Sequence, residues 1–261
     1  MSFKRLDPED FVLSAEAVTN ALWTGFSPKL ATFFTSSVQE ATTGQYYLSV
    51  YQTASLISGS EVQFDIAYGD SQGSGSYLYD ISVTGSSPTR TIYGQYRSLV
   101  LGDENASFIF GNITSSGFYI LNIDRNRYKE SLLPGSLTLK LTSGSNSVIL
   151  TDDSKIATTN VFTDAGRLYN LVSGSAGTVY TGRNAQGWAG GTSALSGSYG
   201  WFLPDIGVIL LNPKAISASI NVASSQSVNA DGNNFQTLFK AISGSGPVSG
   251  SGSFTLQSQE T

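Results

Sequence analysis

The chain has 261 residues, of which 40% are hydrophobic and 13% are charged, with a formal net charge of −5 at pH 7. This length and apolar content suffice for one large β domain or two small ones, and the acidic balance argues against direct contact with nucleic acid. Cysteine and histidine are both absent, which excludes disulfides, zinc sites built on thiolates or imidazoles, and catalysis by Ser-His or Cys-His pairs.

The 28 glycines, 14 phenylalanines and 13 tyrosines predict many strands joined by Gly/Ser turns. We therefore expect an all-β fold, mainly an antiparallel sandwich or barrel-like structure, with an N-terminal arm and at most one or two short helices. No apolar run approaches the roughly 20 residues of a membrane-spanning helix, and the MSFKRLDPED start does not resemble a Sec-type signal peptide. The sequence predicts no membrane contact.

Composition shifts divide the chain into four predicted parts. These are an N-terminal arm (1–35), a β domain or first β half (36–143), a second β half with a long Gly-rich loop (144–243), and a Gly/Ser-rich C-terminal tail (244–261). In the arm, Asp7-Pro8-Glu9-Asp10 is typical of a helix start, although an extended arm fits the following residues equally. An aromatic group follows, which predicts either contacts with another chain or a plug in the domain's own core; its members include Trp23, Phe26 and Phe33.

The region from Tyr46 to Gly102 begins with β patterning. The alternation of Val62, Phe64, Ile66 and Tyr68 with polar residues predicts a strand that is buried on one side. Residues 77–102 then combine tyrosines with Arg90 and Arg97 around a Ser87-Pro88 break. This combination is typical of protein contact surfaces and of sugar-binding surfaces, although a buried tyrosine layer explains the rings nearly as well.

The run from Phe118 to Leu141 is the strongest β signal. Its first part, residues 118–123, is continuously apolar and predicts a strand buried on both faces, whereas alternation over residues 137–141 predicts a strand buried on one face. The connection between them carries five charges, including Arg125, Arg127 and Lys129. It is interpreted either as a solvated or internally paired bend or as a loop that docks on another subunit.

The second half continues with short strands and loops. Asp152-Asp153 indicates a turn or cap more than a cation site, and Trp188 lies in the Gly-rich stretch 182–200, where it predicts either a contact finger or a ring tucked into its own domain. The patterns further predict a core strand at 206–211, a one-sided strand at 216–222, a short helix at 235–242 and a last strand at 254–256.

Several blocks resemble one known family. They are FKRLDPEDFV near the start, SPTRTIYGQYRSLVLGD from Ser87, RNRYKESLLPGSLTLKL from Arg125, LTDDS from Leu150, DAGRLYNLVSG from Asp164 and PDIGVILLN from Pro204. The family consists of virion structural proteins of contractile-tailed, cyanophage-like myoviruses. The resemblance implies a non-enzymatic structural subunit that is assembled in the host cytoplasm into the virion, most simply in the tail or baseplate, with neck and capsid decoration left open.

That resemblance implies partners among other virion proteins in multiple copies, with no cofactor. The predicted contact residues are Trp23, Phe26, Phe33, Arg90, Arg97, Arg125, Arg127, Lys129 and Trp188. Two other functions stay open at this point. One is a glycan-binding module for the host surface, and the other is a carboxylate hydrolase using Asp152, Asp153 or Glu130, whose spacing does not indicate a converging pair.

Overall fold

The computed structural model describes residues 18–36, 46–53, 59–73, 88–111, 113–159, 161–180, 188–189, 196–222, 234–244 and 249–260. At 188–189 and 196–197 it describes the backbone alone. Its strands are β1 (Val18–Ala21), β2 (Lys29–Thr35), β3 (Tyr47–Thr53), β4 (Ser60–Asp70), β5 (Phe108–Phe110), β6 (Ile113–Ser115), β7 (Gly117–Ile123), β8 (Ser131–Leu132), β9 (Thr138–Ser143), β10 (Asn146–Asp152), β11 (Val161–Thr163), β12 (Gly166–Ser175), β13 (Thr178–Val179), β14 (Trp188–Ala189), β15 (Ser196–Gly197), β16 (Gly200–Leu203), β17 (Val208–Leu211), β18 (Ser249–Thr255) and β19 (Gln257–Glu260). The helices are α2 (Pro88–Leu101), α3 (Pro213–Ile220), α4 (Asn234–Ser243) and the 3₁₀-helix η2 (Arg125–Arg127).

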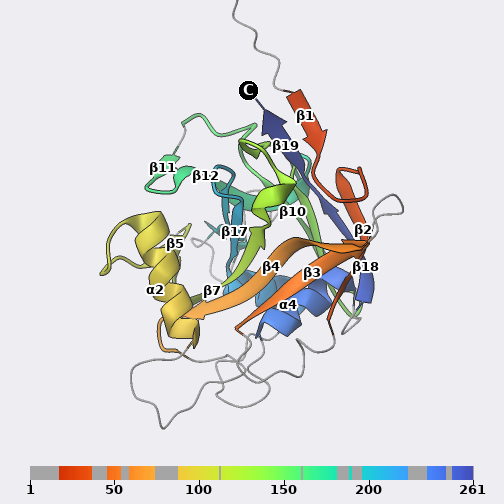
Figure 1. Cartoon of the computed structure of the whole chain (residues 1–261). Helices are drawn as coiled ribbons and strands as arrows, with labels where there is room; N and C mark the ends of the chain where they lie inside the picture. The colour runs from red at the N-terminus through yellow and green to blue at the C-terminus, as the bar shows by residue number, and fades with distance from the viewer. Residues whose placement is uncertain are drawn as a thin grey trace, which may run out of the picture.

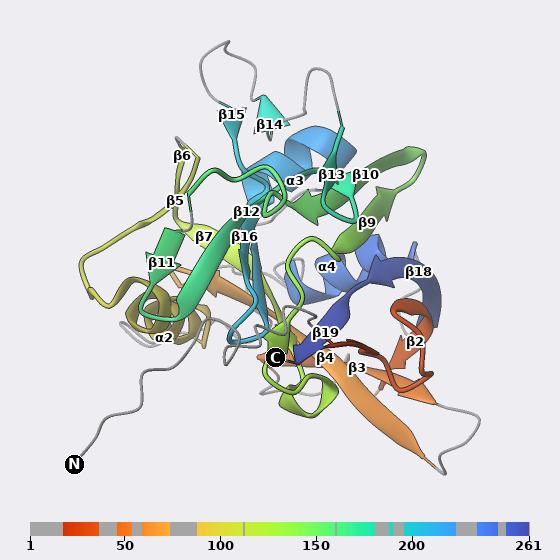
Figure 2. The ribbon, with the colours of Figure 1, turned by 90° about the horizontal axis from the view of Figure 1, so that it is seen from above.

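The main sheet closes into an antiparallel barrel (Figures 1 and 2). Ten strands are hydrogen-bonded in the order β10-β9-β18-β2-β3-β4-β7-β17-β16-β12, and β12 pairs with β10 again to complete the ring. Closure satisfies the backbone groups that an open sheet leaves unpaired at its two edges. The expectation of an all-β, barrel-like fold is confirmed.

Both ends of the described chain are integrated into this architecture. β2 and β18 are neighbouring barrel strands, and β1, β19 and β8 form a separate three-stranded sheet. The described parts of the predicted arm (1–35) and tail (244–261), residues 18–35, 244 and 249–260, are instead strands and connections of the folded domain, because the buried side chains of Leu30, Phe33 and Phe254 anchor them in the core. Of the last strand expected at 254–256, residues 254–255 belong to β18, and Leu256 lies between β18 and β19. The helix start expected at 7–10 lies outside the described residues.

The described residues form three α-helices where at most two were expected, and one of them replaces a predicted strand. Residues 216–222 alternate in polarity, yet 213–220 form α3, because Pro213 occupies its first turn and the Asn212 side chain accepts a hydrogen bond from Lys214 N at 3.1 Å. Ile216 and Ile220, which are four residues apart, lie on the same face of the helix and are both buried. The helix expected at 235–242 is confirmed as α4.

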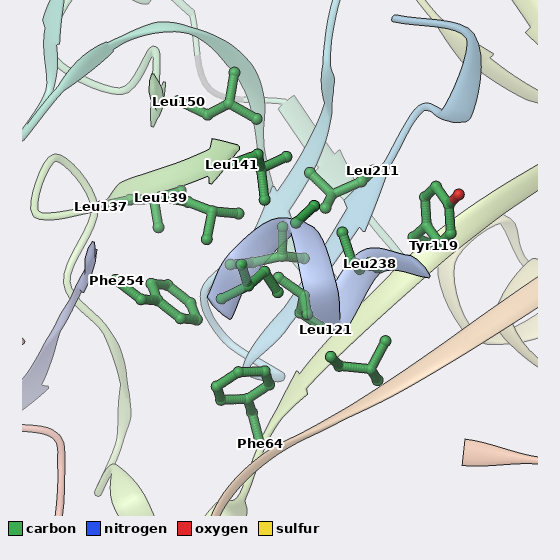
Figure 3. Close-up of a cluster of buried hydrophobic side chains, with 14 of the residues drawn as sticks. Phe64, Tyr119, Leu121, Leu137, Leu139, Leu141, Leu150, Leu211, Leu238 and Phe254 are labelled. Atoms are coloured by element: carbon green, nitrogen blue, oxygen red, sulfur yellow. The ribbon is translucent and has the colours of Figure 1, made fainter. Parts of the chain in front are cut away.

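Helix α4 fills the barrel interior (Figure 3). It contacts β3, β4, β7, β9 and β18, and its apolar side chains pack against the inward-facing barrel residues in one cluster. Leu238, Phe239 and Ile242 are each no more than 2% exposed. Apolar side chains therefore occupy the interior of the barrel. Sites that contact other molecules lie on its outer surface.

Strand β7 is buried on both faces, as the continuous apolar run predicted. Tyr119 and Leu121 belong to the interior cluster, whereas Phe118 and Ile120 belong to a second cluster outside the barrel. That outer cluster includes Tyr93 of α2, whose ring lies 5.3 Å from the Phe118 ring. Helix α2 therefore covers part of the outer wall of the barrel (Figure 1). Among the described residues, no helix is long and apolar enough to cross a membrane.

Candidate functional site

The charged connection between β7 and β8 folds onto the chain itself. Asp124 Oδ1 accepts a hydrogen bond from Asn126 N at 2.8 Å and caps η2. The Arg125 guanidinium donates to the Tyr128 carbonyl and lies 4.6 Å from the centre of the Tyr128 ring, a cation–π distance. Lys129 pairs with Glu260 at 2.8 Å, although its side chain is 72% exposed. These contacts match the interpretation of an internally paired bend.

Arg127 joins three segments that are distant in sequence. Its guanidinium pairs with Glu61 at 2.8 Å and donates a hydrogen bond to the Thr24 hydroxyl. The Thr24 hydroxyl also donates a hydrogen bond to Glu61 at 2.8 Å, and it accepts one from Gln63 Nε2 at 2.6 Å. The Thr24 hydrogen bond and the Arg127 charge hold the pKa of Glu61 below its usual value. The cluster fastens the bend and the β1–β2 connection to β4.

The predicted aromatic contact residues divide between core and surface. Trp23 and Phe33 are buried; the Trp23 indole donates to the Pro28 carbonyl at 2.9 Å, and the Phe33 ring lies 5.8 Å from the Phe239 ring of α4. These two rings act as core residues of this chain. Phe26, in contrast, is 69% exposed in the turn between β1 and β2, with a positive φ of 54°.

The remaining predicted contact residues lie on or beyond α2. Arg90 is exposed on α2. Arg97 is half-buried and lies 5.8 Å from the centre of the Tyr93 ring, so it contributes to helix packing. The backbone of Trp188 is paired with Gly197 in the β14–β15 hairpin, but its side chain lies outside the described residues, as does the tyrosine-bearing segment 74–87.

The carboxylates considered for hydrolysis hold loops together. Asp152 is fully buried, and its Oδ2 accepts hydrogen bonds from Gly135 N at 2.7 Å and from the Ser154 hydroxyl. Asp153 accepts from the backbone and side chain of Asn170 at 2.9 and 3.2 Å. Burial raises the pKa of Asp153. Within the described residues, no group of three or more His, Cys, Asp or Glu side chains could hold a metal ion.

A cavity of about 530 Å³ lies on the outer wall of the barrel under α2. Strand register explains its floor, because Tyr47, Ala67 and Ile120 are direct partners across β3, β4 and β7. In the next outward-facing row, Asp65 is paired with Asn122. Since side chains alternate between the faces of a sheet, both rows point out of the barrel.

Helix α2 supplies the wall of this cavity. The lining residues recur three or four positions apart, which places them on one face of the helix, and they are Pro88, Thr91, Ile92, Gln95 and Tyr96. Tyr46 completes the rim. It is 43% exposed and Tyr47 is 49% exposed, so two tyrosine rings stand partly in solvent beside an apolar floor.

The electrostatics of the cavity come from one half-buried carboxylate, that of Asp65. Burial raises the pKa of Asp65, opposed by a hydrogen bond from the Ser49 hydroxyl to its Oδ1 at 2.7 Å. Burial together with the Asp65 charge raises the pKa of Tyr96 to about 12, so this phenol keeps its proton at neutral pH. None of the described lining residues is a lysine or arginine. The described lining is therefore mainly apolar, with one carboxylate and without a cationic side chain.

Sequence reasoning did not identify this cavity. It treated Tyr46 and Tyr47 as the start of a strand and the Ser87-Pro88 pair as a break, whereas Pro88 begins α2. The signal available in the sequence was the helical spacing of Ile92, Tyr96 and Val100 after that proline. The position of the helix over β3, β4 and β7 required the tertiary structure.

A second outer feature is an exposed apolar surface, here named the β11 surface. β11 is the end strand of its path and pairs only with β12 among the described strands. β11, β5 and the C-terminal end of α2 lie together on one side of the barrel in both views (Figures 1 and 2). The large apolar side chains exposed on these elements are Leu99 at 47%, Ile109 at 50%, Val161 at 48% and Phe162 at 69%.

Comparison with protein-family models gives no match. Comparison with curated proteins and with solved structures gives none either.

Proposed function

We propose that the chain is a structural subunit of a phage virion, most simply of the tail or baseplate, that acts through contacts with neighbouring subunits. The observation that carries the proposal is the β11 surface on the outside of a barrel whose interior is filled. Large exposed apolar side chains on neighbouring elements of a folded protein mark sites of contact with other macromolecules. The resemblance of several sequence blocks to virion structural proteins of cyanophage-like myoviruses supplies the identity of the assembly.

The chemistry of the β11 surface favours a protein neighbour. Phe162 supplies a large ring of the kind enriched at the centre of protein interfaces. Val161 and Phe162 lie in β11, whose outer edge has no partner strand among the described strands. A strand from a neighbour would satisfy the backbone groups of that edge while its side chains cover the apolar surface.

The contact site proposed here differs from the one expected from charge. Arg125, Arg127 and Lys129 are engaged within the chain, so moving them onto a neighbour would require breaking these bonds. Burial of Val161 and Phe162 would break none. The β11 surface is therefore the less costly place for a subunit contact, and neck or capsid decoration would use the same surface.

The direct test is to purify phage particles through a density gradient and to identify their proteins by mass spectrometry. We expect the chain to co-purify with the particle at a constant ratio to the other structural proteins. A chain found only in the soluble fraction of the lysate, with none in washed particles, would refute the virion role.

The contact surface is tested by Phe162→Glu in a phage that lacks its own copy of the gene. Phe26→Glu is the matched control, because both phenylalanines are 69% exposed while the β1–β2 turn and β11 lie on opposite sides of the barrel (Figure 2). We expect both variants to fold and Phe162→Glu alone to be missing from particles. Incorporation of Phe162→Glu at the wild-type level would refute this surface as the contact.

A further inference from the structure

We propose that the cavity under α2 binds a neutral saccharide. Its volume of about 530 Å³ lies within the range of small-molecule sites, which are concave, largely apolar and carry a few polar groups that fix orientation. The cavity combines a flat apolar floor, half-exposed tyrosine rings and uncharged hydrogen-bonding side chains. That combination suits the apolar ring face and the hydroxyl groups of a sugar.

The floor and rim suit the apolar face of a sugar ring. Ala67 and Ile120 provide a shallow surface without polar side-chain atoms, and Tyr46 and Tyr47 stand beside it. A pyranose ring presents its C–H groups on one face, and these groups pack on apolar or aromatic surface while the hydroxyl groups point outward. Tyrosine serves this purpose well because its ring is apolar and its hydroxyl stays in contact with water.

Three side chains provide hydrogen bonds for hydroxyl groups. Asp65 and Asn122 are partners in the second outward-facing row of the floor, and Gln95 of α2 lines the same cavity. A carboxylate accepts hydrogen bonds, whereas each amide both donates and accepts. Sugar hydroxyls do both as well, so vicinal hydroxyls match this set, whereas a purely apolar ligand would leave these polar groups unpaired at a cost.

Charge decides against an anionic ligand. Asp65 is the charged side chain of the described lining, and no described lysine or arginine lines the cavity to compensate a ligand carboxylate or phosphate. Like charges held close together without compensation are unfavourable. The geometry therefore points to an uncharged saccharide and excludes uronic acids and sugar phosphates as the preferred class.

This site is independent of the β11 surface. The cavity is lined by the face of α2 that bears Ile92 and Tyr96, whereas the β11 surface involves the C-terminal end of the same helix and the β11 edge. A structural subunit of a virion can carry a saccharide site, and loss of either property leaves the other testable by a different assay.

Isothermal titration calorimetry of the purified full chain tests the proposal. The probes are three neutral trisaccharides, namely maltotriose, cellotriose and triacetylchitotriose, each titrated to about 10 mM so that binding with a millimolar Kd is detected. Trigalacturonate serves as the anionic comparison. We expect at least one neutral trisaccharide to bind and trigalacturonate to bind at least about tenfold more weakly. Absence of binding by all three neutral probes, or equal binding of trigalacturonate, overturns the proposal.

Substitutions locate the bound saccharide. Tyr47→Ala and Gln95→Ala each remove a side chain from the cavity lining, and both are expected to weaken binding at least about tenfold, which corresponds to ~1.4 kcal/mol. Tyr180→Ala is the matched control, because Tyr180 is 44% exposed against 49% for Tyr47 and does not line the cavity. Circular dichroism verifies that each variant is folded. Binding that survives both substitutions in the cavity lining, or that Tyr180→Ala weakens equally, places the saccharide elsewhere and overturns the proposal.

Discussion

Leu238→Ala tests whether α4 fills the barrel. Leu238 is 1% exposed and lies at the centre of the interior cluster, with Leu121, Leu139 and Leu211 around it (Figure 3). The substitution removes three buried carbon atoms, which at about 0.8 kcal/mol per methylene amounts to about 2.4 kcal/mol of transfer free energy. The cavity left behind adds to this cost, because a ring of hydrogen-bonded strands cannot collapse onto the space.

We therefore expect Leu238→Ala to lower the free energy of unfolding by about 3–4 kcal/mol, within the range of about 2–5 kcal/mol for buried leucines. Urea denaturation followed by tryptophan fluorescence measures the change. The matched control is Leu99→Ala, the same substitution at a helical residue that is 47% exposed; it is expected to cost less than about 1 kcal/mol. Equal losses for the two variants would refute the placement of α4 inside the barrel.

Two further predictions concern one charge and one backbone position. Replacing Arg127 with Met removes a partner that keeps the pKa of Glu61 below 4.5. The variant should therefore have a lower melting temperature than the wild type at neutral pH. This difference should shrink as the pH falls through the lowered Glu61 pKa, since protonation of Glu61 removes the same interaction from the wild type. A pH-independent difference in melting temperature would contradict this assignment. Gly200→Ala should lower the free energy of unfolding by more than about 3 kcal/mol, because φ of Gly200 is 151° and a Cβ there would lie 1.8 Å from the Leu210 carbonyl oxygen. Chemical denaturation measures this loss. The control is Gly94→Ala, whose added Cβ would have no atom within 4 Å and which should stabilise α2 by about 0.5–1 kcal/mol.

The order of apolar and polar residues correctly predicted two elements, each of which shows one clear hydrophobic pattern along its length. The continuous run 118–123 identified β7 as buried on both faces, and the spacing of Phe235, Leu238, Phe239 and Ile242 identified α4. Both patterns are strong because every apolar residue in them meets the core. The barrel itself was anticipated only as one of two β architectures, since the β10–β12 pairing that closes it joins strands from separate parts of the sequence.

The polarity pattern gave a wrong prediction where a short helix shows the alternation of apolar and polar residues that is typical of a strand. Residues 216–222 alternate in polarity, and the decisive information lay upstream in Asn212-Pro213, a helix cap followed by a first-turn proline. The same oversight applies to Pro88, which starts α2. From the sequence, Pro88 is interpreted as a break, although proline also favours the first turn of a helix.

The candidate sites were less predictable than the fold, because residue type does not reveal what a side chain contacts. Trp23 and Arg127 are residue types typical of interfaces, yet one is a core ring and the other a link between segments of its own chain. The cavity depends on the register of three strands and on the packing of α2 above them. No single segment of the sequence contains that information.

The outer helix α2 contributes to both proposed sites, the cavity and the β11 surface. Its packing residues Tyr93 and Tyr96 lie against Phe118 of β7, with ring distances of 5.3 and 6.2 Å, and this packing holds both the cavity wall and the end of the helix near β11. Because α4 occupies the interior, the position of α2 on the wall determines which outer features the barrel presents. Loss of the Phe118 ring should therefore weaken saccharide binding and subunit contact together, whereas Tyr47→Ala should affect only the first and Phe162→Glu only the second.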